Sequence, residues 1–336
     1  MKKRITWNMG LALAVFVLSA ACRHRDGEGF VTALLPADSL TAAHLSGYTS
    51  WARCGDKVVT YSLPSDPSFS AYRLPDFEYL YSFDVLTPRP GRYYAAGIFP
   101  AGAEARELSV IGLSERTLYR LEVGEDSARV VQRYPGAEKV VYVNGTMVSD
   151  SLAIVGTMNF LEKSHRVTLL DVRQWDTLGR IESKTLLDAA FNAVNYPVFA
   201  VSQNGVALVY KSYKRIEYYR PKTDGTLEFV KAVGGQYDRD DVARMKADAA
   251  PLDGPVDVAW DERYLYLLEN AVNRNGKIQA SRIEMFDWQG RGCYRLRLER
   301  PATKILPDAR RGKLYALRPN LDSSRVYVYD IRAFAD

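Results

Sequence analysis

Histidine and cysteine are scarce in this sequence, with three of each among 336 residues. The histidines, His24, His44 and His165, are widely separated, and neither an HExxH nor a CxxC pair occurs, so common zinc and dithiol motifs are missing. GxSxG, GxGxxG and GxxxxGK[ST] are also missing, and with them the signatures of a hydrolase elbow, a dinucleotide fold and a P-loop. We therefore expect no cofactor and no metal, and no residue is assigned a catalytic role.

An excess of charge of one sign is missing as well. Lys and Arg total 45 against 40 Asp and Glu. Three of the bases fall within residues 1–21, which contain no acid, so the remainder of the chain carries 42 bases against 40 acids. Binding to a polyanion depends on a concentrated positive field. We expect no nucleic-acid partner.

No apolar run is long enough to cross a bilayer, which needs about 20 residues. The apolar run Met9–Leu18 follows Lys2, Lys3 and Arg4 and precedes Ser19-Ala20-Ala21-Cys22. This order is typical of a signal peptide, and small residues before a cysteine resemble the lipobox of bacterial lipoproteins, which implies acylation of Cys22. The alternative is ordinary cleavage with Cys22 as an incidental residue.

These features predict three segments. Residues 1–21 form a lipoprotein signal peptide, 22–49 a lipid anchor and tether, and 50–336 the folded domain. The predicted location is the bacterial cell envelope, anchored by lipid at the periplasmic face or the cell surface, with the outer membrane favoured. An oxidising compartment permits a disulfide between Cys54 and Cys293. The sequence leaves their pairing open, and two buried free thiols are the favoured interpretation.

Beyond residue 50 the sequence shows almost no helical periodicity. Short β-branched and aromatic runs alternate with Gly, Asp and Asn turns, which favours strands. A strand, a tight polar turn and a second strand recur six times, at 53–63, 87–99, 148–157, 201–210, 258–268 and 307–318. A further strand follows each later copy, and alignment of these strands places Glu122, Asp171, Arg220, Asp287 and Asp330 at equivalent positions.

Repeats of 40 to 50 residues built from four short strands are typical of β-propellers. A small sheet cannot bury its own faces, whereas blades stacked in a closed ring cover one another. We predict an all-β protein with a single six-bladed propeller of four-stranded antiparallel blades. The widest repeat interval contains an insertion at 234–255.

The last third of the chain resembles the TolB-like six-bladed propeller lipoproteins of Bacteroidetes. The resemblance rests on VDVAWDERYLYLLENA, SRIEMFDWQGRGCYRLRLE and GKLYALRPNLDSSRVYVYDI. It supports the predicted fold and the envelope location. Most members of that family have no assigned activity, so the resemblance implies no catalytic residue.

Candidate ligand contacts cluster in and near the insertion. They are Tyr237, Asp238, Asp240, Asp241 and Trp260. Close carboxylates can bind Ca²⁺, but the EF-hand pattern is incomplete and Arg239 brings a competing charge, so a solvated loop is favoured. Aromatic rings beside such a loop are typical contacts for a peptide or a sugar.

We therefore expect a non-enzymatic binding or scaffold module for a protein, peptide or glycan, using the end of the ring that carries 234–255. The alternative is a carboxylate-dependent glycan-active enzyme or a metal-assisted hydrolase that uses channel-facing aspartates such as Asp240 and Asp241.

Overall fold

The computed structural model describes most of the chain after residue 30. The described residues are 24–25, 30–43, 45, 49–62, 68–85, 96–100, 107–112, 117–135, 141–149, 151–159, 164–174, 176–181, 197–211, 214–222, 224–235, 254–318 and 325–334. They form strands and two short 3-10 turns. No helix in this described part is long and apolar enough to cross a bilayer.

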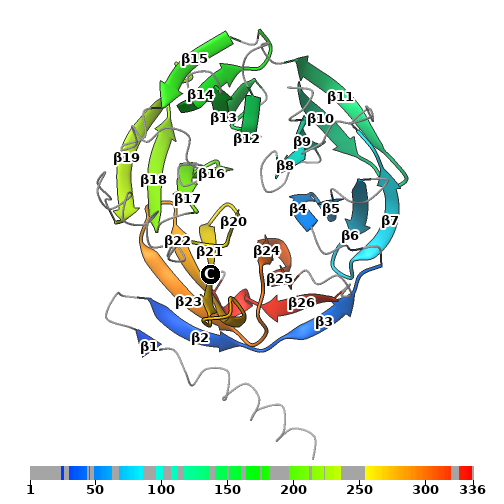
Figure 1. Cartoon of the computed structure of the whole chain (residues 1–336), viewed down its shortest axis with the longest axis vertical. Helices are drawn as coiled ribbons and strands as arrows, with labels where there is room; N and C mark the ends of the chain where they lie inside the picture. Colours follow the sequence, from blue (N-terminus) through cyan, green and yellow to red (C-terminus); the bar gives the residue numbers. More distant parts are fainter. Residues whose placement is uncertain are drawn as a thin grey trace, which may run out of the picture.

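Six antiparallel four-stranded blades surround a central axis, with the first strand of each blade nearest the axis (Figure 1). Blade 1 comprises β4 (Thr49–Cys54), β5 (Lys57–Ser62), β6 (Phe69–Arg73) and β7 (Glu78–Phe83). Blade 2 comprises β8 (Ala96–Pro100), β9 (Glu107–Gly112), β10 (Thr117–Val123) and β11 (Ala128–Pro135). Blade 3 comprises β12 (Val141–Met147), β13 (Leu152–Asn159), β14 (Ser164–Asp171) and β15 (Asp176–Ile181). Blade 4 comprises β16 (Pro197–Ser202), β17 (Gly205–Tyr210), β18 (Arg215–Pro221) and β19 (Leu227–Gly234). Blade 5 comprises β20 (Asp257–Trp260), β21 (Tyr264–Val272), β22 (Ile278–Asp287) and β23 (Gly292–Leu298). Blade 6 comprises β24 (Lys304–Asp308), β25 (Lys313–Leu317), β26 (Arg325–Asp330) and the amino-terminal β3 (Asp38–Thr41). The predicted all-β class and six blades are confirmed.

The core lies between the blades. Strands β5 and β17 are buried along their whole length, because each is sandwiched between two neighbouring sheets. The rim strands β11 and β19 instead alternate between covered and exposed side chains, as a half-buried strand does. Leu265 and Leu267 of blade 5, for example, pack with Ala207 and Val209 of blade 4. Each blade therefore depends on its neighbours for burial of its apolar faces.

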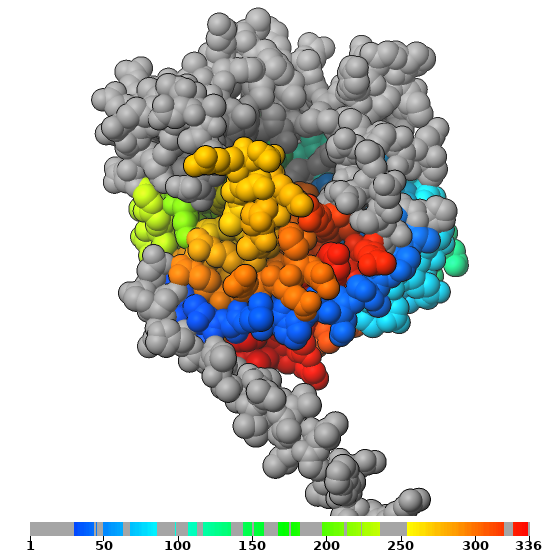
Figure 2. Space-filling model, turned by 60° about the horizontal axis from the view of Figure 1, so that its bottom comes forward, coloured from blue at the N-terminus to red at the C-terminus, as the bar shows by residue number. Residues whose placement is uncertain are grey.

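The amino-terminal segment 30–43, which we call the clasp, closes the ring from outside. β3 pairs with β26 and so supplies the fourth strand of blade 6. Before it, β2 (Val31–Leu35) pairs in parallel with β23 at the rim of blade 5, and β1 (His24–Arg25) pairs with β2. Figure 2 shows this segment, in blue, running across the orange and red parts of blades 5 and 6.

The predicted tether over 22–49 is corrected by this arrangement, because much of that segment belongs to the ring. The physical reason is that blade 6 has only three strands of its own after Lys304, and β3 covers the edge that β26 would otherwise expose. Phe30 also occupies the space left by the missing side chain of Gly292 and packs edge-on against Phe286, with ring centroids 5.5 Å apart. Leu35 of β2 is almost fully buried beside Leu298.

Candidate functional site

The structure describes one of the residues that the sequence predicted as ligand contacts. Tyr237, Asp238, Asp240 and Asp241 lie in the insertion, outside the described residues, and the predicted lipidation site Cys22 lies outside them as well. Trp260 ends β20, the innermost strand of blade 5. Its location therefore assigns it to the centre of the ring.

Trp260 joins two blades at the axis. Its indole Nε1 donates to the carbonyl of Val201 in blade 4 at 2.9 Å. Trp51 of blade 1 makes the corresponding bond to the carbonyl of Ile305 in blade 6 at 3.2 Å. Both rings also line a cavity on the axis. Because a partly buried indole N–H needs an acceptor, these bonds give both tryptophans a structural role as well as a place in a cavity wall.

A large groove lies on blade 5. Its volume is about 980 Å³, and its lining comes from β2, β21, β22 and β23 together with Lys214 of blade 4. β21 and β22 have nine and ten residues, longer than the strands beside them, so their hairpin extends the sheet and leaves this face open. Gly254, a described residue near the end of the insertion at 234–255, is also part of the lining.

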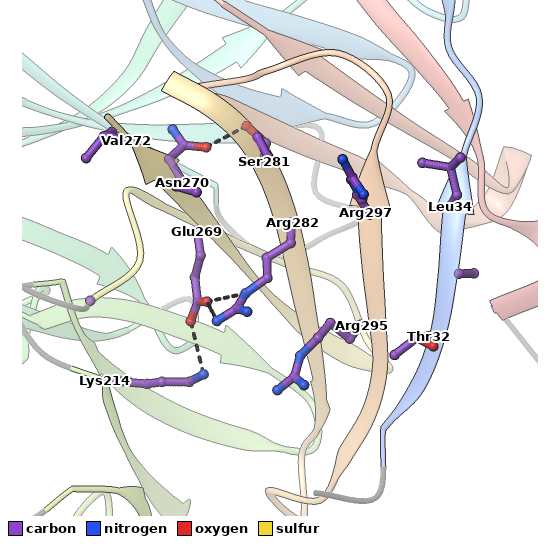
Figure 3. Close-up of a pocket in the computed structure, with 14 residues that line it drawn as sticks. Thr32, Leu34, Lys214, Glu269, Asn270, Val272, Ser281, Arg282, Arg295 and Arg297 are labelled. Carbon is purple, nitrogen blue, oxygen red and sulfur yellow. Dashed lines mark hydrogen bonds and ion pairs between the residues drawn. The ribbon is translucent and has the colours of Figure 1, made fainter. Parts of the chain in front are cut away.

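One row of the groove crosses the sheet from strand to strand. The strand register places Glu269 of β21 opposite Arg282 of β22, Arg282 opposite Arg297 of β23, and Arg297 opposite Leu34 of β2. Cross-strand partners share one face of a sheet. Figure 3 shows these side chains as a band over the strands, with Lys214 approaching from blade 4.

Two carboxylates hold most of the cations of the groove. Glu284 is fully buried and lies 2.6 Å from Lys214 Nζ and 2.7 Å from Arg295 Nη2. Glu269 lies 3.1 Å from Lys214 Nζ and 2.6 Å from Arg282 Nη2. A buried carboxylate is costly unless cations compensate it, and these contacts fix the positions of the three basic side chains.

Arg297 completes the row without an acidic partner among the described residues. Its guanidinium is exposed, and its cross-strand neighbour Arg282 carries the same charge. Like charges placed opposite each other destabilise a strand pair. The groove thus has four basic side chains, Lys214, Arg282, Arg295 and Arg297, against two carboxylates, Glu269 and Glu284. Its field favours a negatively charged partner.

Aliphatic side chains flank the basic row. Leu34 is 63% exposed and Val272 is 43% exposed, and both line the groove. Exposed aliphatic residues beside arginines are typical of protein-binding surfaces, where Arg is enriched and the centre is apolar. The arrangement can bind an acidic segment that also carries apolar side chains. One signal in the sequence could have indicated this basic surface. Arg295 and Arg297 are two residues apart, which places both on one face of a strand.

The two internal cysteines lie in different blades. Both are free: Cys54 is buried on β4 of blade 1, and Cys293 is partly buried on β23 of blade 5. Burial raises the pKa of the Cys54 thiol to about 12. The favoured interpretation of two free thiols is confirmed, although Cys293 is less buried than expected. Among the described residues, no group of three or more His, Cys, Asp or Glu side chains lies close enough together to hold a metal ion.

Comparison with known proteins shows the fold and no closer relationship. No protein-family profile and no curated protein sequence matches the chain. A solved structure from Bacteroides fragilis, described as a candidate exported protein, matches with a TM-score of 0.55 at 10% identity over 88% of this chain and 94% of that one. A member of the DUF4221 family from Bacteroides vulgatus matches with a TM-score of 0.54 at 9% identity over 88% and 97%. A luciferin-regenerating enzyme matches with a TM-score of 0.52 at 14% identity over 88% and 95%.

Proposed function

We propose that this protein is an exported, lipid-anchored binding module of the bacterial cell envelope, which docks an acidic segment of a partner protein in the groove on blade 5. The observation that carries the proposal is the basic pair of Arg282 and Arg297 in the groove, flanked by exposed Leu34 and Val272. An acidic partner would relieve the repulsion between Arg282 and Arg297 and cover the aliphatic side chains. The groove offers charged and apolar side chains for binding, and the role we propose for it is non-enzymatic.

The groove proposal predicts a selective loss of partner binding. Replacing Arg297 with Glu and Leu34 with Ser changes two exposed side chains and puts a carboxylate opposite Arg282, so the fold should be retained. Affinity capture of the tagged protein from solubilised envelopes should recover at least about tenfold less of any stoichiometric partner, since charge reversal in an interface costs several kcal/mol.

A matched control exists on the rim of blade 2. Val131 and Arg133 of β11 are an exposed apolar and basic pair, two residues apart on a rim strand. Val131→Ser with Arg133→Glu makes the same change in charge and a similar loss of hydrophobicity far from the groove, and it should leave recovery unchanged. Equal recovery from the wild type and both double variants would contradict the proposal.

The lipid anchor is supported by the lipobox-like residues before Cys22, by the resemblance to TolB-like lipoproteins and by a fold shared with a candidate exported protein. Cys22→Ser should move the protein from the membrane fraction to the soluble fraction, because a single hydroxyl cannot replace thioether-linked acyl chains. Intact mass spectrometry of the wild type should give the chain from Cys22 plus lipid. An unmodified mass, or a Cys22→Ser protein that stays in the membrane, would refute the anchor.

A further inference from the structure

A second cavity lies on the propeller axis and shares no lining residue with the groove on blade 5. The innermost strands of all six blades contribute to it, through Trp51, Ile98, Asn144, Phe199, Trp260 and Ile305. Its volume is about 230 Å³. One water occupies about 30 Å³ of the liquid, so the cavity has room for a small organic molecule.

The charges in this cavity do not balance around Lys211. Lys211 and Lys304 both lie near Asp257, but both oxygens of the Asp257 carboxylate already have partners. Its Oδ1 lies 3.1 Å from Lys304 Nζ, and its Oδ2 accepts from the backbone N–H of Ile305 at 2.9 Å. Lys211 Nζ makes no hydrogen bond or ion pair with any described residue. Loss of water around the ammonium lowers its pKa, and Lys304 adds to that effect.

The other charged groups of the lining have partners of their own. Arg53 lies 3.1 Å from Asp308. Asp261 accepts from the hydroxyl of Tyr266 at 2.6 Å and from two backbone N–H groups. Two ammonium groups thus share one carboxylate on the Lys211 side of the cavity. A partly buried cation without a counter-charge is unfavourable, and an anionic ligand would correct that.

We propose that the central cavity binds a small organic carboxylate, whose carboxylate group pairs with Lys211 Nζ. Trp51 and Trp260 form flat walls on which the carbon skeleton rests. The proposal concerns a site separate from the groove and does not depend on a protein partner.

Calorimetric titration tests the proposal with three probes that share one sugar ring: D-glucuronate, D-glucose and D-glucose 6-phosphate. The wild type should bind glucuronate saturably and more tightly than glucose. Lys211→Met should weaken glucuronate binding at least about tenfold, since a hydrogen bond to a charged group contributes about 1.5–3 kcal/mol. Lys277→Met, at an exposed lysine of the β21–β22 turn, should bind like the wild type.

A second measurement separates ligand binding from a structural role. Without ligand, Lys211→Met should unfold at the same temperature as the wild type or higher, because it removes a charge that has no partner. Glucuronate affinity of the wild type should fall as the pH rises through the lowered pKa of Lys211, where the ammonium is lost.

Three results would overturn the proposal. They are no saturable heat with glucuronate, equal affinity of the wild type and Lys211→Met, or a lower unfolding temperature of Lys211→Met. Tighter binding of glucose 6-phosphate than of glucuronate would overturn the assignment to a carboxylate and identify a phosphate site instead.

Discussion

Replacing Asp308 with asparagine is expected to lower the free energy of unfolding by about 3–5 kcal/mol. Asp308 of blade 6 is fully buried and lies 3.1 Å from Arg53 Nη1 of blade 1, across the seam where the ring closes. It also lies 2.8 Å from Arg311 Nη1. The asparagine keeps the shape but removes the negative charge that Asp308 places beside the buried Arg53 guanidinium. Urea denaturation followed by tryptophan fluorescence measures the loss.

The control for this prediction is Asp330→Asn. Asp330 pairs with Arg332 in an exposed contact, and such contacts contribute about 0–1 kcal/mol. The double variant Asp308→Asn, Arg53→Met should regain most of the lost free energy of unfolding, because it also removes the positive charge of Arg53. If Asp308→Asn costs no more than Asp330→Asn, the ion pair at the seam does not stabilise the closed ring.

Removing the clasp is expected to open the ring. A chain that starts at Thr49 lacks β3 and exposes the edge of β26, and it also loses the buried side chains of Phe30 and Leu35. Each such side chain contributes about 1.5–3 kcal/mol, so the thermal midpoint should fall by at least about 10 °C. Differential scanning calorimetry checks the shift, and a midpoint equal to that of the full chain would refute a closing role.

A rearranged chain tests which part of the clasp matters. β3 starts opposite Val328, close to where β26 ends, so residues 36–43 joined after Phe334 by a short linker can form a hairpin with β26. This chain should regain part of the lost midpoint, because blade 6 again has four strands. The same chain with Leu40→Pro should not, since proline removes a ladder donor and disfavours strand pairing.

The blade count was predictable because the strand–turn–strand pattern recurs six times and five of the six blades carry a charged residue at the same place. Glu122, Asp171, Arg220, Asp287 and Asp330 all lie at the carboxyl-terminal end of the third strand of blades 2 to 6. The aspartates accept from backbone N–H groups of the turn that follows, for example Arg173 N to Asp171 at 2.9 Å. In blades 3, 5 and 6 a short carboxylate thus caps the turn, and a charged residue repeats at this position in blades 2 and 4.

Other features were missed for physical reasons. The repeat copy at 87–99 was placed too early, because the first two strands of blade 2, β8 and β9, are separated by a longer connection than in the other blades. β2 and β3 have only five and four residues, too few for a periodic signal, and their partners are about 260 or more residues away. Distant pairing of this kind leaves no local pattern.

The two candidate sites differ in how much of them the sequence could reveal. Trp260 was selected for its nearness to the insertion, and its position in the wall of the central cavity is a property of its inner strand. The groove depends on the register that brings Arg282 beside Arg297 and Leu34, which no spacing along the chain reveals. The position of Lys211 beside the ion pair of Lys304 and Asp257 became apparent only from the three-dimensional structure.

The parallel pairing of β2 with β23 has a mechanical consequence. Tension on the chain before Phe30, directed along the strand, loads all five residue pairs of this ladder at once, in shear. The hydrogen bonds must then break together, instead of one after another as in a peeled hairpin. A molecule pulled from its amino terminus in this way would resist through blade 5 before any force reached the seam between blades 6 and 1.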